Sequence, residues 1–162
     1  MHFRYYIAFV VLLLGTPSCS SKIEYLPADI SGLTLVNRLT GDDAGEFVNN
    51  LHFEPVADTK NEIGFYQSET GSAVIYIAHY NNKVEADNNY KKMTGKISKG
   101  TSVFIKPGYI YVDEHKIFRC FGMGQSHFVF TLDKELYWVT ADTFIGKSFV
   151  EKYLDFIDEY YK

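Results

Sequence analysis

The chain of 162 residues has only two cysteines, Cys19 and Cys120, so a disulfide-rich scaffold is excluded. It also lacks an excess of basic charge, since 16 Lys and Arg face 20 Asp and Glu, giving a net charge of -4 and a pI of 5.7. A nucleic-acid binder normally carries a basic stripe. The composition therefore indicates a small globular domain that binds no nucleic acid.

Catalytic motifs are missing as well. The chain contains no Gly-x-Ser-x-Gly and no Ser-x-x-Lys sequence, and Gly122-Met123-Gly124 lacks the third glycine of a dinucleotide fingerprint. Cys120 lies in the middle of an expected strand, where a nucleophile is not usually presented. We therefore expect a protein that is not an enzyme and that carries no cofactor.

The first 18 residues have the three zones of an export signal. Arg4 precedes an apolar run from Ile7 to Leu14, and small residues then lead to Cys19. The run is shorter than the roughly 20 residues that a transmembrane helix needs. The sequence before Cys19 resembles the lipobox of bacterial lipoproteins, which implies cleavage after residue 18 and a lipid on Cys19. Plain secretion is the alternative.

Export and lipidation set further expectations. A mature chain starting at Cys19 would have a net charge of -5 and no polybasic segment, so acyl chains alone would hold it to the membrane of the cell envelope. Cys120 would then have no partner and would be a buried apolar residue, whereas a Cys19–Cys120 disulfide requires that lipidation fail. Residues 19–31 are polar and contain Pro27, which favours a tether, followed by a single domain over 32–162.

Apolar periodicity predicts the elements of this domain. A short strand near 33–37 precedes a helix in which Ala44, Phe47, Val48 and Leu51 share one face. A hairpin is expected at 63–80 around Glu69-Thr70-Gly71, then a helix capped by Asn82 and Glu85. Further strands are expected at 102–105, 109–112, 116–121, 126–131 and 135–141, with a type II turn at Pro107-Gly108. A last helix is expected at 145–160, with a core-facing stripe formed by Ile145, Phe149, Tyr153, Phe156 and Tyr160.

The hairpin-and-helix pattern occurs twice with an offset of 63 residues. The offset aligns Phe65 with Phe128, Ala78 with Ala141, Tyr90 with Tyr153, and Met93 with Phe156. Together with the βαββαβ order from 33 to 105, this predicts an α+β fold: an antiparallel sheet with helices mainly on one face, a two-layer sandwich related to the ferredoxin-like plan, with an internal duplication.

This element order resembles, in layout only, the small uncharacterised domains of bacterial lipoproteins and periplasmic proteins. The stretches that carry the resemblance are Gly-Met-Gly-Gln-Ser-His at 122–127 and Tyr-Trp-Val-Thr-Ala-Asp ending at Asp142. The resemblance spans residues 33–160 and implies no activity and no functional residue.

Tyrosine is abundant, with 13 residues, and is the main functional signal. Exposed tyrosines give rigid, amphipathic contact area at interfaces. One sheet face could carry Tyr76, Tyr80, Tyr109, Tyr111 and Tyr137, and would be free if helices covered only the other face. We therefore expect a binding or scaffold module whose partner is an envelope protein or a small ligand.

Histidines support the alternative function. His79 and His127 lie on expected strands without a second histidine nearby, which is usual for structural residues. They are nevertheless candidate ligands for haem or a metal, or candidate catalytic groups of an envelope enzyme, if a cleft between the two repeat units brings them together.

Overall fold

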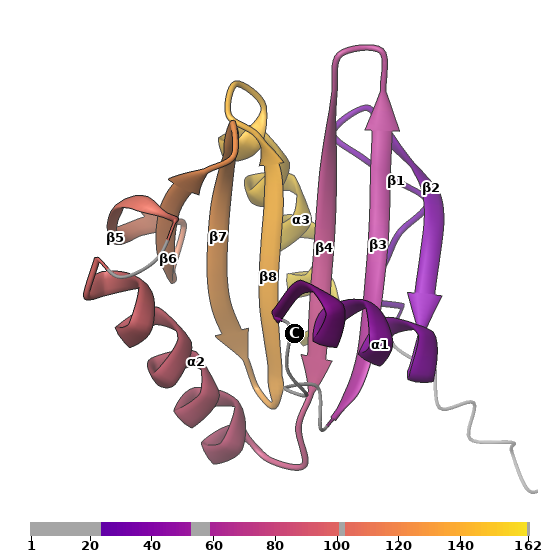
Figure 1. Ribbon diagram of the computed structural model, residues 1–162. Helices are drawn as coiled ribbons and strands as arrows, with labels where there is room; N and C mark the ends of the chain where they lie inside the picture. Colours follow the sequence, from indigo (N-terminus) through magenta and orange to yellow (C-terminus); the bar gives the residue numbers. More distant parts are fainter. Residues whose placement is uncertain (1–23, 53–58, 101–102, 162) are drawn as a thin grey trace, which may run out of the picture.

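A computed structural model describes residues 24–52, 59–100 and 103–161 (Figure 1). The elements follow the order β1 (Asp29–Ile30), β2 (Leu33–Thr40), α1 (Gly41–His52), β3 (Lys60–Ser68), β4 (Gly71–His79), α2 (Lys83–Ser98), β5 (Ile105–Val112), β6 (His115–Gly122), β7 (Gln125–Leu132), β8 (Glu135–Asp142) and α3 (Gly146–Tyr161). The fold is α+β, as the sequence predicts.

All the strands of the described residues join one antiparallel sheet. Its eight strands have the order β1-β2-β3-β4-β8-β7-β6-β5, so the β3–β4 hairpin meets the β7–β8 hairpin along β4 and β8. The hairpin around Glu69-Thr70-Gly71 is confirmed, and a Met123-Gly124 turn joins β6 to β7. The type II turn expected at Pro107-Gly108 is wrong, because β5 runs through these residues with a β-bulge and Lys106 at a φ of 51°.

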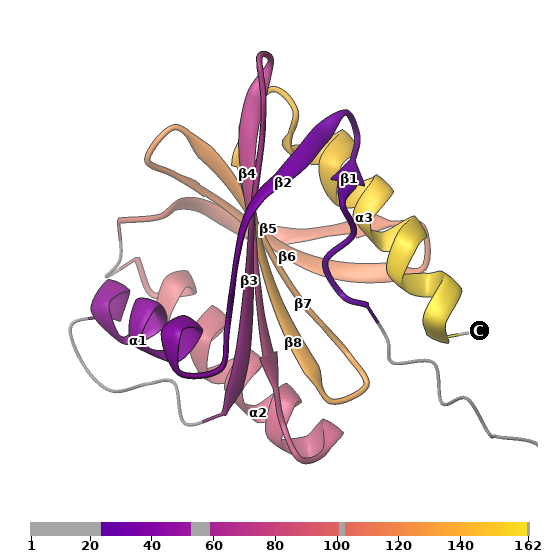
Figure 2. The ribbon, with the colours of Figure 1, turned by 90° about the vertical axis from the view of Figure 1, so that its right-hand side faces the viewer.

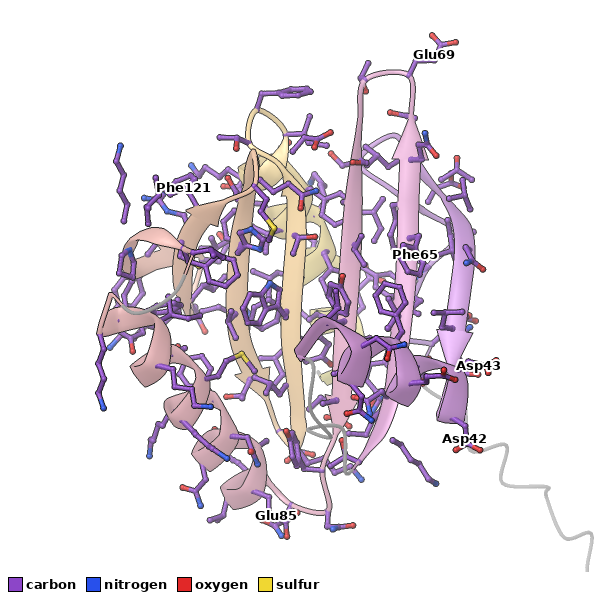
Figure 3. The ribbon with its side chains drawn as sticks, in the orientation of Figure 1. Asp42, Asp43, Phe65, Glu69, Glu85 and Phe121 are labelled. Atoms are coloured by element: carbon purple, nitrogen blue, oxygen red, sulfur yellow. The ribbon has the colours of Figure 1, made fainter. Side chains whose placement is uncertain are left out.

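Helices cover both faces of the sheet. Figure 2 shows α1 and α2 on one side and α3 on the other. Phe47 of α1 packs edge-on against Phe65 of β3, which Figure 3 shows on the α1 side, whereas Phe149 of α3 packs against Tyr66 of β3. The arrangement therefore has three layers, which differs from the expected two-layer sandwich and leaves no sheet face wholly uncovered.

The segment 24–30 packs against the domain on the α3 side and is not a free tether. The side chain of Leu26 is 1% exposed and lies over Gly64, where a Cβ would approach it to 2.8 Å. The Tyr66 hydroxyl donates to the Pro27 carbonyl, and the Tyr153 hydroxyl donates to the Tyr25 carbonyl. The predicted tether of 19–31 is therefore too long, because apolar burial of Leu26 and Ile30 extends the domain toward the N-terminus.

The core is divided by the sheet into two clusters. The larger cluster lies under α3, where Phe149 and Tyr153 of the predicted aromatic face are fully buried, together with Ile157. The smaller cluster lies under α2 and includes Cys120, which is buried, as expected; Cys19, its alternative disulfide partner, lies outside the described residues. Burial raises the pKa of the Cys120 thiol to about 11.

The α2 helix begins as the capping box predicts. The Asn82 side chain accepts a hydrogen bond from the Glu85 backbone N–H, and Glu85 Oε1 accepts one from the Asn82 side chain. No helix among the described residues is long and apolar enough to cross a membrane. Residues 1–18 and Cys19 lie outside the described residues.

Elements 63 residues apart follow the same order, but the corresponding residues lie on opposite faces of the sheet. Ala78 packs with the cluster under α2, whereas Ala141, its partner at the offset, lies in the cluster under α3. The two hairpins are neighbours in the sheet, yet their following helices lie on opposite sides (Figure 2). An internal duplication stays a prediction.

Candidate functional site

The five candidate tyrosines do not form one surface. Tyr76, Tyr80 and Tyr109 contact residues on the side of the sheet that α1 and α2 cover, and Tyr111, two residues along β5 from Tyr109, faces the same side. Tyr137 lies on the opposite side, is 0% exposed, and packs against Phe130 and Tyr153. The prediction for Tyr137 is therefore wrong, because alternation along β8 turns it into the α3 core.

Of these five tyrosines, only the two on β5 are well exposed. Tyr109 is 51% and Tyr111 71% exposed, whereas Tyr76 and Tyr80 are half-buried, and burial raises the pKa of Tyr76. Burial also raises the pKa of Tyr90 on α2, and the neighbouring Tyr109 adds to this effect. Edge-on packing against Phe118 holds the Tyr109 ring in place.

Basic side chains lie against the aromatic rings at this edge. Lys116 Nζ is 4.3 Å from the centre of the Tyr109 ring, and the Arg119 guanidinium is 5.0 Å from the centre of the Phe121 ring. Phe121 appears on β6 near this end of the sheet in Figure 3. We call residues 103–112 with Lys116 the β5 edge surface. Its exposed apolar residues are Val103, Ile105, Tyr109 and Tyr111.

His127 is a buried structural residue. It is 2% exposed, and its Nδ1 accepts a hydrogen bond from the Trp138 indole N–H at 3.2 Å. Its Nε2 then carries the proton and donates to the Gly122 carbonyl at 3.1 Å. Burial lowers the pKa of His127, so the ring stays neutral, with both nitrogens occupied.

His79 lies on the other face of the sheet, between two carboxylates. Its Nδ1 is 3.5 Å from Glu135 Oε1, and its Nε2 is 3.3 Å from Glu62 Oε1, although the angle is unsuitable for a hydrogen bond at Nε2. Glu135 is 2% exposed and also accepts the Tyr25 hydroxyl at 3.0 Å. We call Tyr25, Arg38, Glu62, His79 and Glu135 the His79 cluster.

Arg38 lies at the solvent-facing side of the cluster and contacts Glu62. Its guanidinium donates to Glu62 at 2.6 Å and to Glu24 at 3.1 Å. The pKa of Glu62 is lowered to about 2, chiefly by His79, with Arg38 adding to this effect and burial opposing it. Burial alone would lower the pKa of His79, but Glu135 and Glu62 outweigh it and raise the pKa to about 9.

An open cavity of about 1310 Å³ lies beside this cluster. Polar side chains from several elements line it, including Asn49 of α1, Asn61 of β3 and Lys134 of the β7–β8 turn. Within the described residues, no three His, Cys, Asp or Glu side chains are placed to share a metal ion. The two carboxylates lie near different nitrogens of His79, which suits an ion-pair network better than a metal centre.

Sequence reasoning singled out His79 but missed Glu62, Glu135 and Arg38. These residues come from β3, β8 and β2, and only the sheet register places Glu135 opposite His79. His79 and His127 lie on opposite faces, so the expected cleft that would join them does not form. The one signal in the sequence was His79 itself, a polar residue that follows Ala73, Ile75 and Ile77 on the same face of a strand.

The His79 cluster predicts a specific dependence of stability on pH. Because the pKa of His79 rises from 6.5 to about 9 on folding, its stabilisation is complete below pH 6.5 and is lost as the pH rises through 9. Because the pKa of Glu62 falls from 4.5 to about 2, its stabilisation is present above pH 4.5 and is lost toward pH 2. Urea unfolding should therefore show the highest free energy between about pH 5 and 6.5.

The matched variant for this measurement is His79→Gln. The loss of unfolding free energy between about pH 6 and pH 10 should be on the order of 2 to 3 kcal/mol larger in the wild type than in this variant. Parallel curves for the two proteins over this range would show that His79 does not carry the effect.

Comparisons with known proteins identify the fold alone. No family model and no curated protein sequence matches the chain. A crystal structure described as a GTP binding regulator from Thermotoga maritima is similar to it over 78% of each chain, with a TM-score of 0.54 and 14% sequence identity. The two proteins therefore share the α+β architecture, and at this identity the likeness extends no further.

Proposed function

We propose that the protein is a lipid-anchored module of the bacterial cell envelope that binds a partner protein and does not catalyse a reaction. The observation that carries the binding role is the β5 edge surface, where Tyr109 and Tyr111 are exposed on the last strand of the sheet. Exposed tyrosines are enriched at protein interfaces, where they supply rigid, amphipathic contact area.

The histidines give little support to the alternative of a haem or metal carrier or an enzyme. His127 uses both ring nitrogens for hydrogen bonds, and His79 sits between Glu62 and Glu135 with both of its nitrogens facing carboxylates. A ligand to haem iron or a metal needs a free nitrogen lone pair.

The proposed anchor rests on the sequence from residue 1 to Cys19. The apolar run, the small residues and the cysteine fit a lipoprotein signal, and the segment 24–30 then attaches the chain directly to the domain. A lipid on Cys19 would therefore hold the domain close to the membrane through residues 20–23.

Photo-crosslinking in a bacterial host that exports the protein tests the proposal. A photoreactive phenylalanine replaces Tyr111 in one strain and the equally exposed Phe144 in the control strain. We expect a discrete crosslinked protein from position 111 and none from position 144. In the same host, Cys19→Ala should move the protein from the membrane fraction to the soluble fraction.

Each half of the proposal has its own contradicting result. Equal crosslinking from positions 111 and 144, or none from either, would argue against a binding role for the β5 edge surface. Continued membrane association of Cys19→Ala would argue against the lipid anchor.

A further inference from the structure

The two edges of the sheet differ in how far other residues cover the edge strand. At one edge, β1 pairs with the start of β2, the Leu35 N–H donates to the Ala28 carbonyl, and Arg38 bridges Glu24 and Glu62. At the other edge, the described residues place no strand beyond β5. An uncovered strand edge is a template for pairing with another chain.

The register shows which backbone groups of β5 point outward. A two-residue turn at Asp113-Glu114 joins β5 to β6, so Val112 and His115 form a hydrogen-bonded pair. Alternation then turns the N–H and C=O groups of Ile110 toward β6 and those of Tyr109 and Tyr111 away from it. Both tyrosines thus offer backbone donors and acceptors at the open edge.

The open part of β5 is poorly protected against such pairing. Lys106, Pro107 and the bulge disrupt its first residues, which is a common defence of edge strands. The following residues, Gly-Tyr-Ile-Tyr-Val at 108–112, contain neither a charge nor a proline. Tyrosine, isoleucine and valine favour strands, so this stretch is suited to accept a further strand.

The charge around this edge is opposite in sign to that of the whole chain. Residues 91–119 contain seven Lys and Arg against two Asp and Glu, whereas the rest of the chain contains nine against eighteen. Lys106 and Lys116 are exposed on the two strands of the edge, and Lys92, Lys96 and Lys99 are exposed on or just after α2. An incoming strand with acidic side chains is therefore attracted to the edge.

We propose that β5 accepts an extended, acidic segment of a partner protein as an added strand, with backbone bonds to Tyr109 and Tyr111 and ion pairs to Lys106 and Lys116. This inference rests on the proposed binding function and names its partner. A second copy pairing through the same edge is disfavoured, because it would bring the two sets of lysines together. Strand addition of this kind takes affinity from the backbone and specificity from the side chains.

Fluorescence anisotropy with full-length protein in detergent tests the proposal. The probe is a labelled peptide of roughly ten residues that alternates glutamate and valine, long enough to cover the strand. One control peptide has lysine for glutamate, and a second carries N-methyl groups on alternate amides, which removes donors without changing the charge. We expect the acidic peptide to bind at least about tenfold more tightly than either control.

Variants of the protein locate the binding site. Tyr111→Pro removes an outward N–H that β6 does not use and should weaken binding by about tenfold or more, whereas Val36→Pro, at the unpaired bulge of β2, should leave it unchanged. Thermal unfolding checks that Tyr111→Pro is folded. If it is not, the double variant Lys106→Glu/Lys116→Glu decides, because it should lose the acidic peptide and gain the lysine peptide.

Three results would overturn the inference: equal binding of acidic and basic peptides, binding that N-methylation does not reduce, or a dimer by light scattering that Tyr111→Pro dissociates. The last result would identify a second copy as the occupant. If position 111 still crosslinks to a protein but the peptides do not bind, the proposed binding function is still supported. Only the strand-addition mode is then contradicted.

Discussion

Tyr137→Ala is expected to destabilise the protein by about 3 to 5 kcal/mol, the range for removing a large aromatic ring from a core. Tyr137 is 0% exposed, stacks on Phe130 with ring centres 5.0 Å apart, and meets Tyr153 of α3 edge-on. Its removal leaves a cavity at the point where α3 joins the sheet. Urea unfolding monitored by circular dichroism measures the loss.

Tyr111→Ala is the matched control for this substitution. Tyr111 is 71% exposed on β5, so its loss should change the unfolding free energy by no more than about 0.5 kcal/mol. The two variants remove the same side chain from the two faces of one sheet. Similar losses in both would contradict the division of the tyrosines into a core residue and a surface residue.

Glu135→Ala is expected to cost about 3 to 5 kcal/mol near pH 7, because it removes one partner of a buried ion pair. The carboxylate is 2% exposed, lies 3.5 Å from His79 and accepts the Tyr25 hydroxyl. The substitution removes this carboxylate from the His79 ring and from the Tyr25 hydroxyl. It therefore weakens the attachment of the segment 24–30 to the domain. Denaturant unfolding at pH 7 gives the cost.

A surface ion pair supplies the comparison for Glu135. Lys147 and Glu151 form an exposed pair on α3 at 3.4 Å, and Lys147→Ala should cost no more than about 1 kcal/mol. The double variant His79→Leu/Glu135→Leu should be more stable than Glu135→Ala, because it removes both buried charges together. A double variant no more stable than Glu135→Ala would show that the cost is one of packing and not of charge.

The sequence was most informative where local chemistry decides the structure. Asn82 and Glu85 predicted the start of α2, Glu69-Thr70-Gly71 predicted a hairpin, and the spacing of Phe149 and Tyr153 predicted the buried face of α3. In each case residues within one or two turns of each other supply the interaction. Pro107-Gly108 misled, because the same pair that favours a turn is accommodated at a bulge of an edge strand.

Long-range packing could not be predicted in the same way. The period of two along β8 shows that Tyr137 and Trp138 face opposite sides, but not which side α3 covers. The His79 cluster depends on the pairing of β4 with β8, between strands that are distant in sequence. The burial of Leu26 depends on the space above Gly64, which no local pattern in residues 24–30 reveals.

The docked segment 24–30 also determines how far the protein can reach. With a lipid on Cys19, the five residues up to Glu24 span at most about 18 Å when fully extended. The eight strands, spaced about 4.8 Å apart, put β5 roughly 34 Å from β1. A protein anchored in this way would bring its open edge only to molecules within about 50 Å of the bilayer surface, so a partner fixed to another surface would have to extend into that layer.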